Sequence, residues 1–357
     1  MKKVIIVLFL VAVFNVKAYS AESMYALDLD NDIVYYDHNS NEEKLIASVT
    51  KIMSAIVTIE CVDLEKEVVV GDEVLKAYGS AIYIEKGEKI KLKDLLYGLM
   101  LRSGNDAAVV IAKNVAGSME SFVSLMNEMA IKLNLNNTYF YNNHGLEEND
   151  GKGNVSTARD LAILTKYAMK NKTFRAIFGT KSYKVKTNYK SYSWINKNKL
   201  LHSEDYITGG KTGFTKKARR TLVTTGSRNN INVVVVTLND GNDFLDHKKM
   251  YESIFRNYKA VLVVDKDKLN IKDEKYYKGD KLYLKDSIYV SVKDDKKEKI
   301  KVNYDLYKEK YKDKDVVGKV KVTKDGKLIR EDNIYVKVMK KSEKNMKKSI
   351  FGKWSWW

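Results

Sequence analysis

The succession of periodic segments constrains the fold of this chain more than any other feature of its sequence. Two short alternating strands are predicted within residues 25–36, and strong strands recur only at 221–226 and 232–238. The sequence between them has mainly helical periodicity, with helices predicted at 48–61, 92–101, 106–115, 118–133 and 157–169, and a further helix follows at 244–258. Because strands come from both ends of this region, we predict an α+β fold in which helices flank an antiparallel sheet.

Beyond Val261 the composition changes to a lysine-rich alternation of charged and apolar residues, clearest at 281–290, 297–302 and 317–322. This pattern is typical of short antiparallel strands with one solvated face, so it predicts a separate, small all-β domain. The expected organisation is a leader at 1–20, an α+β domain at 21–259, a β-rich C-terminal domain at 260–340 and a tail at 341–357.

The first 20 residues have the pattern of a secretory signal peptide. Two lysines precede an apolar run at 4–14, and the small residues Ala18, Ser20 and Ala21 follow it. The run is shorter than the roughly 20 apolar residues that a spanning helix needs, so a retained membrane anchor is the weaker alternative. Cleavage after any of the three small residues fits the pattern. We therefore expect an exported, extracytoplasmic protein.

A formal charge of +18 at pH 7 favours anionic partners, which include nucleic acid, acidic lipid headgroups and anionic wall polymers. Export removes nucleic acid from this group. The tail at 341–357 is rich in lysine and tryptophan, side chains that suit the boundary between water and lipid: Lys347, Lys348, Lys353, Trp354, Trp356 and Trp357. This composition predicts contact between the tail and an anionic membrane surface.

Serine and lysine open the predicted helix at 48–61 in the pattern Ser48-Val49-Thr50-Lys51. Residues three apart lie on one helix face, so the Ser48 hydroxyl and the Lys51 amine can come within hydrogen-bond distance. A serine becomes nucleophilic when a base takes its proton, and lysine can act as that base where its pKa is lowered. Taken alone the pattern is weak, because it occurs by chance in many proteins.

Two further motifs carry polar groups at interruptions of the predicted elements. Ser103-Gly104-Asn105 separates two apolar helices and, taken alone, fits a helix cap. Lys211-Thr212-Gly213 precedes strong strands. It combines a positive charge, a hydroxyl and a residue that allows close approach to the backbone, which suits a substrate carboxylate.

The three motifs together, in this order, are the set of penicillin-binding proteins and class A β-lactamases. The chain resembles the low-molecular-mass penicillin-binding proteins that act as serine-type D-Ala-D-Ala carboxypeptidases, over nearly the whole mature sequence. The stretches that carry this resemblance are 47–53, 99–108, 144–146, 156–161, 196–201 and 211–213. The resemblance implies a β-lactamase/transpeptidase-like domain followed by a small all-β C-terminal domain.

The resemblance also implies how the site works. Lys51 would deprotonate Ser48, which attacks the carbonyl between the last two D-alanines of a peptidoglycan stem peptide. Ser103 would pass a proton to the departing D-alanine, and Asn105 would orient Lys51. The terminal carboxylate would be held by Lys211 and Thr212, next to Gly213, and the oxyanion by the backbone N–H groups of Ser48 and Phe214. β-Lactams would acylate Ser48 and deacylate slowly, and no cofactor or metal is needed.

The chain departs from the family pattern at Asn143, where proline is common, and at Arg219, where glycine is usual, followed by Arg220. A β-lactamase on the same scaffold remains an alternative, with Glu147 and Glu148 as weak candidates for the carboxylate that rapid deacylation requires. A non-catalytic wall-binding protein is the second alternative.

Two other kinds of reactive side chain are given no functional role. The single cysteine, Cys61, is predicted to pack within its apolar helix. His38, His144, His202 and His247 are scattered without ligand spacing, and His144 is interpreted as structural.

Overall fold

The computed structural model describes residues 19–148, 150–271, 275–294 and 297–339, so the predicted leader and the tail at 341–357 lie almost entirely outside the described residues. A five-stranded antiparallel sheet with the order β2-β1-β11-β10-β9 organises the larger domain. Its strands are β1 (Ser23–Asp28), β2 (Val34–His38), β9 (Ile207–Thr215), β10 (Arg219–Arg228) and β11 (Ile231–Leu238). The expected sheet with strands from both ends of the region is therefore confirmed.

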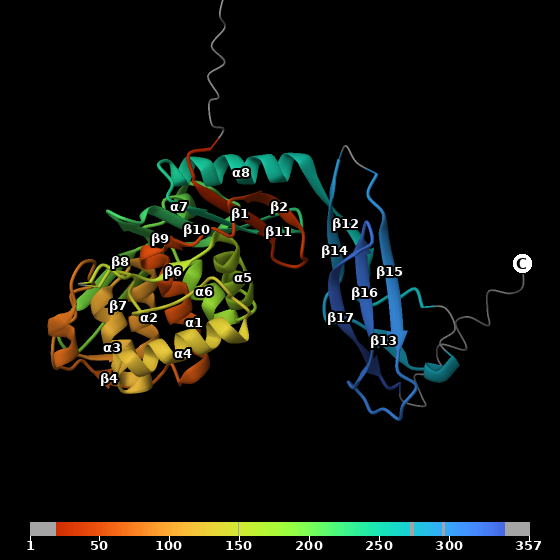
Figure 1. Ribbon diagram of the computed structural model, residues 1–357. Helices are drawn as coiled ribbons and strands as arrows, with labels where there is room; N and C mark the ends of the chain where they lie inside the picture. The colour runs from red at the N-terminus through yellow and green to blue at the C-terminus, as the bar shows by residue number, and fades with distance from the viewer. Residues whose placement is uncertain (1–18, 149, 272–274, 295–296, 340–357) are drawn as a thin grey trace, which may run out of the picture.

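Helices cover both faces of this sheet (Figure 1). Helix α8 (Asp243–Asn257) lies on one face, and a helical block lies on the other. The block comprises α1 (Lys51–Cys61), α2 (Leu92–Leu101), α3 (Asn105–Ala116), α4 (Met119–Lys132), α5 (Ala158–Ala168) and α6 (Lys172–Phe178), while the short α7 (Leu200–Ser203) precedes β9. The predicted helices are thus confirmed within two or three residues at their ends, whereas α6 was not predicted.

Alternation along β11 explains why both faces are covered. Val234, Val236 and Leu238 belong to the core shared with the helical block, whereas Val233 and Val235 belong to the core beneath α8. Successive side chains of a strand point to opposite faces, so a strand that is apolar throughout must be buried on both sides.

Short elements complete the larger domain. They are the strand pairs β3 (Lys44–Leu45) with β6 (Val155–Ser156), β4 (Glu67–Val69) with β5 (Lys89–Lys91) and β7 (Ser182–Lys186) with β8 (Ser191–Ile195), and the 3₁₀ turns η1 (Ala47–Thr50) and η2 (Asp72–Lys76). The side chain of Thr157 accepts a hydrogen bond from the Asp160 N–H at 3.0 Å and so caps the start of α5.

The C-terminal domain is all-β, as predicted. Strand β12 (Tyr258–Val264) pairs with β14 (Ile288–Lys293), and a four-stranded sheet follows in the order β13-β17-β16-β15. Its strands are β13 (Lys281–Tyr283), β15 (Ile300–Leu306), β16 (Val316–Lys324) and β17 (Lys327–Lys337), and the turn η3 (Lys275–Tyr277) precedes β13. The alternation predicted at 281–290 is split between β13 and β14, and β17 was not predicted.

Hydrogen bonds join the two domains at the β1–β2 connection. The Tyr35 hydroxyl lies 2.8 Å from Asp28 Oδ2 and 2.7 Å from Ser291 Oγ, and the Asn31 side-chain amide donates to the Tyr289 carbonyl at 3.1 Å. Among the described residues no single helix is long and apolar enough to cross a membrane; by length and composition only the bent pair α3 and α4 would qualify together.

Cys61 corrects one prediction. It is the last residue of α1 and is exposed, because the buried face of that helix ends at Thr58. The expected packing role for Cys61 is therefore wrong.

Candidate active site

Ser48 and Lys51 meet at the junction between η1 and α1. Side chains three apart eclipse in a 3₁₀ turn, and Lys51 Nζ lies 3.1 Å from Ser48 Oγ. Gly145, with φ of 92°, packs against this turn so closely that a Cβ would lie 2.0 Å from the Ala47 carbonyl oxygen. Only glycine fits there, because both the space and the left-handed backbone exclude a side chain.

The Lys51 ammonium is surrounded by oxygen atoms and isolated from water. Its Nζ also donates to Asn105 Oδ1 at 2.8 Å and to the His144 carbonyl at 2.6 Å, and the residue has no exposed surface. Burial, and then the positive charges of Lys211 and Lys197, hold the pKa of Lys51 well below its usual range, while Asp106 opposes them. A lysine in this position can be neutral and accept a proton.

The second motif contributes a strained serine and a fixed amide. Ser103 has φ of 63°, so the left-handed residue at this helix break is the serine and not Gly104. Its buried hydroxyl has no hydrogen-bond partner among the described residues. Asn105, at the start of α3, donates through Nδ2 to the Tyr78 carbonyl at 2.6 Å, which fixes its Oδ1 toward Lys51.

Asp106 binds the loop between η2 and β5, a role that the sequence did not reveal. Its buried carboxylate accepts from the backbone N–H groups of Ile82 at 3.0 Å, of Tyr83 at 2.7 Å and of Ala107 at 2.9 Å. Burial raises the pKa of Asp106, and these backbone bonds lower it. In the same loop, the Ser80 carbonyl accepts a hydrogen bond from the Asn105 N–H at 2.7 Å. The Asp106 carboxylate therefore helps to position Asn105.

The third motif lies on β9, the edge strand of the five-stranded sheet. A Cβ on Gly213 would lie 3.0 Å from the Ser48 nitrogen, so glycine lets the strand approach the serine. Lys211 is buried and donates to the Thr212 carbonyl at 2.7 Å. Burial, and then the charge of Lys197, lowers the pKa of Lys211 to about 7. An extended peptide can add to the free edge of such a strand.

A cavity of about 390 Å³ joins the three motifs. Its lining contains five residues of the predicted site, Ser48, Ser103, Thr212, Gly213 and Phe214. Lys51, Asn105 and Lys211 are buried beside it and show at most 3% of their surface. The lining also contains residues outside the predicted set of catalytic and substrate-binding residues: Ser80, Lys197, Lys199, Arg220, Asp243 and Phe244. Lys197 lies in the stretch 196–201, whose resemblance to the family was the signal that could have predicted its place in the site.

The two arginines that depart from the family pattern have separate explanations. Arg219 has φ of 59°, a left-handed conformation that glycine adopts more readily than arginine. This explains why glycine is usual at this position. Arg220 is bonded to the buried carboxylate of Asp243 through Nε at 2.9 Å and Nη2 at 2.8 Å, and its guanidinium lies 5.4 Å from the centre of the Phe244 ring. The Arg220 charge is therefore held at the wall of the cavity.

Asn143 and His144 follow each other at the back of the site. Asn143 is buried and donates to the Ala108 carbonyl at 2.7 Å. The His144 carbonyl, not its imidazole, contacts Lys51. Burial, and then the charge of Lys51, lowers the pKa of the His144 ring to about 3, so this ring stays neutral at physiological pH.

The carboxylates considered for a β-lactamase lie outside the cavity. Glu147 accepts a hydrogen bond from Thr215, and Glu148 accepts from Asn142 Nδ2 at 2.6 Å. Among the described residues that line the cavity, the only carboxylate is that of Asp243, which is paired with Arg220. The arrangement does not favour rapid deacylation by a neighbouring carboxylate.

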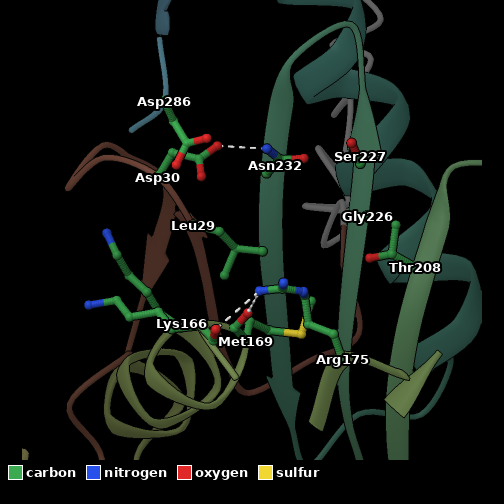
Figure 2. A pocket seen from close by; sticks show the side chains of 11 residues that line it. Leu29, Asp30, Lys166, Met169, Arg175, Thr208, Gly226, Ser227, Asn232 and Asp286 are labelled. Carbon is green, nitrogen blue, oxygen red and sulfur yellow. Dashed lines mark hydrogen bonds between the residues drawn. The ribbon is translucent and has the colours of Figure 1, made fainter. Parts of the chain in front are cut away.

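A larger cavity of about 560 Å³ lies away from Ser48, between the end of α5, the sheet and the C-terminal domain (Figure 2). Figure 2 shows Arg175 crossing it and Asp30 bonded to Asn232 near Asp286. Its lining contains no paired nucleophile and base like Ser48 and Lys51. In the described parts of the chain, no group of three or more His, Cys, Asp or Glu side chains is placed to hold a metal ion.

The fold and the cleft define a serine-type peptidase of the penicillin-binding class, in which a Ser-x-x-Lys pair, a Ser-x-Asn segment and a Lys-Thr-Gly strand surround one cavity. Residues 12–242 match the family described as D-alanyl-D-alanine carboxypeptidase, peptidase S11, and residues 258–350 match the C-terminal domain of penicillin-binding protein 5.

Individual relatives agree with this class. The chain is 34% identical over 225 residues to D-alanyl-D-alanine carboxypeptidase DacF of Bacillus subtilis, covering 61% of this chain and 57% of that protein. It is 31% identical over 277 residues to DacC of Escherichia coli, covering 73% and 67%. The match therefore spans little more than half of the first relative.

Solved structures give the same fold. A point mutant of the Streptomyces K15 DD-transpeptidase is 31% identical with a TM-score of 0.62, covering 67% of this chain and 98% of that one. Penicillin-binding protein 5 from Haemophilus influenzae has a TM-score of 0.69 over 89% of this chain and 97% of its own at 23% identity, and so is similar in fold, C-terminal domain included. The chain belongs to the peptidase S11 family of D-alanyl-D-alanine carboxypeptidases and carries the C-terminal domain of penicillin-binding protein 5.

Proposed function

We propose that this chain removes the terminal D-alanine from peptidoglycan stem peptides ending in D-Ala-D-Ala, through an acyl-enzyme on Ser48. The observation that carries the proposal is the 3.1 Å contact between Ser48 Oγ and the buried Lys51 amine, whose pKa is lowered. A neutral amine at this distance can take the hydroxyl proton as the oxygen attacks the peptide carbonyl.

The neighbouring groups would serve the remaining steps. The oxyanion would lie between the backbone N–H groups of Ser48 and Phe214, since Gly213 lets β9 approach the serine. The unpartnered hydroxyl of Ser103 would pass a proton to the leaving amine. Asn105, fixed by its bond to the Tyr78 carbonyl, would keep Lys51 in place.

The cationic wall of the cavity would select the substrate. Lys211 and Thr212 would bind the terminal carboxylate of a peptide laid along β9, in keeping with the edge position of that strand. Water would then hydrolyse the Ser48 ester. A β-lactam also carries a carboxylate and an acylating carbonyl, so it would acylate the same Ser48 hydroxyl. Hydrolysis of that ester would be slow.

Replacing the nucleophile tests this proposal. The exported protein should release D-alanine from an N-acylated peptide ending in D-Ala-D-Ala and should bind one equivalent of a fluorescent penicillin. Ser48→Ala should lose both activities, while Ser54→Ala, which removes a buried hydroxyl of the next helical turn, should keep penicillin labelling. Labelling that persists in Ser48→Ala would refute the nucleophile, and continuous turnover of nitrocefin would favour a β-lactamase.

We also propose that the chain associates with the outer face of the cytoplasmic membrane through residues 341–357, with the C-terminal domain as a spacer. The lysine and tryptophan content of that segment supports the idea. Deleting the chain from Lys341 onward should abolish sedimentation with anionic liposomes and leave penicillin labelling unchanged. Undiminished sedimentation of the shortened protein would exclude the tail as the anchor.

A further inference from the structure

The first described residues dock on the N-terminal end of α8 (Figure 1). The Ser20 N–H donates to Asp246 Oδ2 at 2.5 Å, and the Ser20 hydroxyl lies 2.5 Å from Asp240 Oδ1 and 2.9 Å from Asp246 Oδ2. The same hydroxyl accepts the Asn242 N–H at 2.9 Å. Tyr19 packs its ring edge-on against Tyr36, with 3.1 Å between their hydroxyl oxygens. This segment is therefore part of the folded body.

The two carboxylates at this contact lack a positive partner. Asp240 and Asp246 show only 1% and 2% of their surface, and neither forms an ion pair with a described residue. The Ser20 hydroxyl has one proton and cannot donate to both at once. Asp240 Oδ2 is buried and accepts no hydrogen bond from the described residues. No described cation neutralises the two acids, and, unlike the fully bonded Asp106, Asp240 still has an oxygen without a donor.

We propose that the mature chain begins at Tyr19 and that its new α-ammonium group occupies this anionic site. A signal peptidase would hydrolyse the Ala18–Tyr19 peptide bond, with water supplying the oxygen of the Ala18 carboxylate and the Tyr19 nitrogen leaving as an ammonium ion. The Tyr19 nitrogen is one residue before the Ser20 nitrogen. It therefore lies within about 6 Å of Asp246 Oδ2. An ammonium has three donors, which meets the shortage of donors at the two acids.

The same geometry separates this cleavage position from the others that the sequence allows. Cleavage after Ser20 or Ala21 would remove the hydroxyl and the N–H that the two acids bind, leaving both carboxylates buried without these donors. Cleavage after Ala18 keeps every one of these contacts and adds a charge. Ala18, the residue before this bond, is one of the small residues that fit a signal-peptidase site.

The contact is connected to the wall of the catalytic cavity. The Asp240 N–H donates to the Arg220 carbonyl at 3.0 Å, and the next acid along, Asp243, binds the Arg220 side chain. Arg220 and Asp243 both line the cavity beside Ser48. Removing residues 19 and 20 should therefore destabilise the start of α8. It should lower the stability of the protein and also slow acylation of Ser48.

The first experiment determines the N-terminus of the protein exported by its host, by intact mass and by sequencing of the N-terminal peptide. A first residue at Tyr19 is expected. A mature chain that lacks Ser20, or one that retains residues before Tyr19, overturns the assignment. This result does not depend on the carboxypeptidase activity.

The second experiment tests the ion pair in purified protein beginning at Tyr19. Acetylating the α-amine should lower the melting temperature by about 2–4 °C, the scale expected when a hydrogen-bonded charge is lost from a protein of this size. In Asp246→Asn the acetylation effect should shrink to about 1 °C, whereas in Asp32→Asn, which neutralises an exposed carboxylate elsewhere, it should remain full. Equal melting temperatures of free and acetylated protein would overturn the pairing.

Discussion

Raising the pH from 7 to 9 should remove the positive charge of Lys211 and with it much of the binding of the substrate carboxylate. A lysine with a lowered pKa is charged below that pKa and neutral above it, and burial places the pKa of Lys211 at about 7. About half of the free enzyme therefore carries the charge at pH 7, and roughly one molecule in a hundred at pH 9. Deprotonation of Lys51 acts in the opposite direction, because it raises the fraction of the base form, and the lowered pKa of Lys51 reduces this contribution.

The size of the effect follows from the bond that is lost. A hydrogen bond to a charged group contributes about 1.5–3 kcal/mol, which corresponds to roughly 10- to 150-fold in affinity. The protonated fraction falls about 50-fold, but enzyme with neutral Lys211 still binds the substrate weakly, so kcat/KM should fall by about 5- to 30-fold between pH 7 and 9.

Steady-state hydrolysis of an N-acylated peptide ending in D-Ala-D-Ala measures this directly, with kcat/KM reporting on the free enzyme. Two controls isolate the carboxylate contact. Lys211→Arg keeps its charge throughout this range and should show no fall with a midpoint near 7, and a peptide with an amidated C-terminus should be a poor, pH-independent substrate. A flat profile in the native enzyme, or the same fall in Lys211→Arg, would refute the reasoning.

Three further substitutions have outcomes that the contacts predict. Asn105→Ala removes the oxygen that binds Lys51 at 2.8 Å and should lower the acylation rate by a fluorescent penicillin about 10- to 100-fold; an unchanged rate would contradict the positioning role. Gly145→Ala places a Cβ 2.0 Å from the Ala47 carbonyl and should lower the free energy of unfolding by about 3 kcal/mol or more in urea titrations. Asp106→Ala should lower the free energy of unfolding by about 2–4 kcal/mol, because the four backbone N–H groups that it binds lose their partner, and should increase proteolysis at 80–84; intact resistance there would show that the loop is held by other contacts.

Local pattern was sufficient for most of the helices and for the three motifs. The spacing of Ser48 and Lys51 predicts their contact, because i and i+3 side chains share a face in any helical turn. The elements that escaped prediction depend on partners far away in the chain. Strand β17 carries the charged run 330–332 and is stabilised by pairing with β13 and β16, and β12 continues directly from α8 and pairs with β14.

The sequence by itself determined the fold class, the family and the candidate residues. It did so through the order of periodic segments, the three motifs and the composition of the chain, because these depend only on the identity and spacing of side chains. Only the tertiary structure decided what surrounds them. The His144 carbonyl beside Lys51 is a backbone group that any residue possesses, and Ser103 and Arg219 have left-handed conformations that their residue types rarely adopt. The lowered pKa of Lys211 likewise arises from burial and from Lys197 across the cleft, and such long-range proximity exists only once the chain has folded.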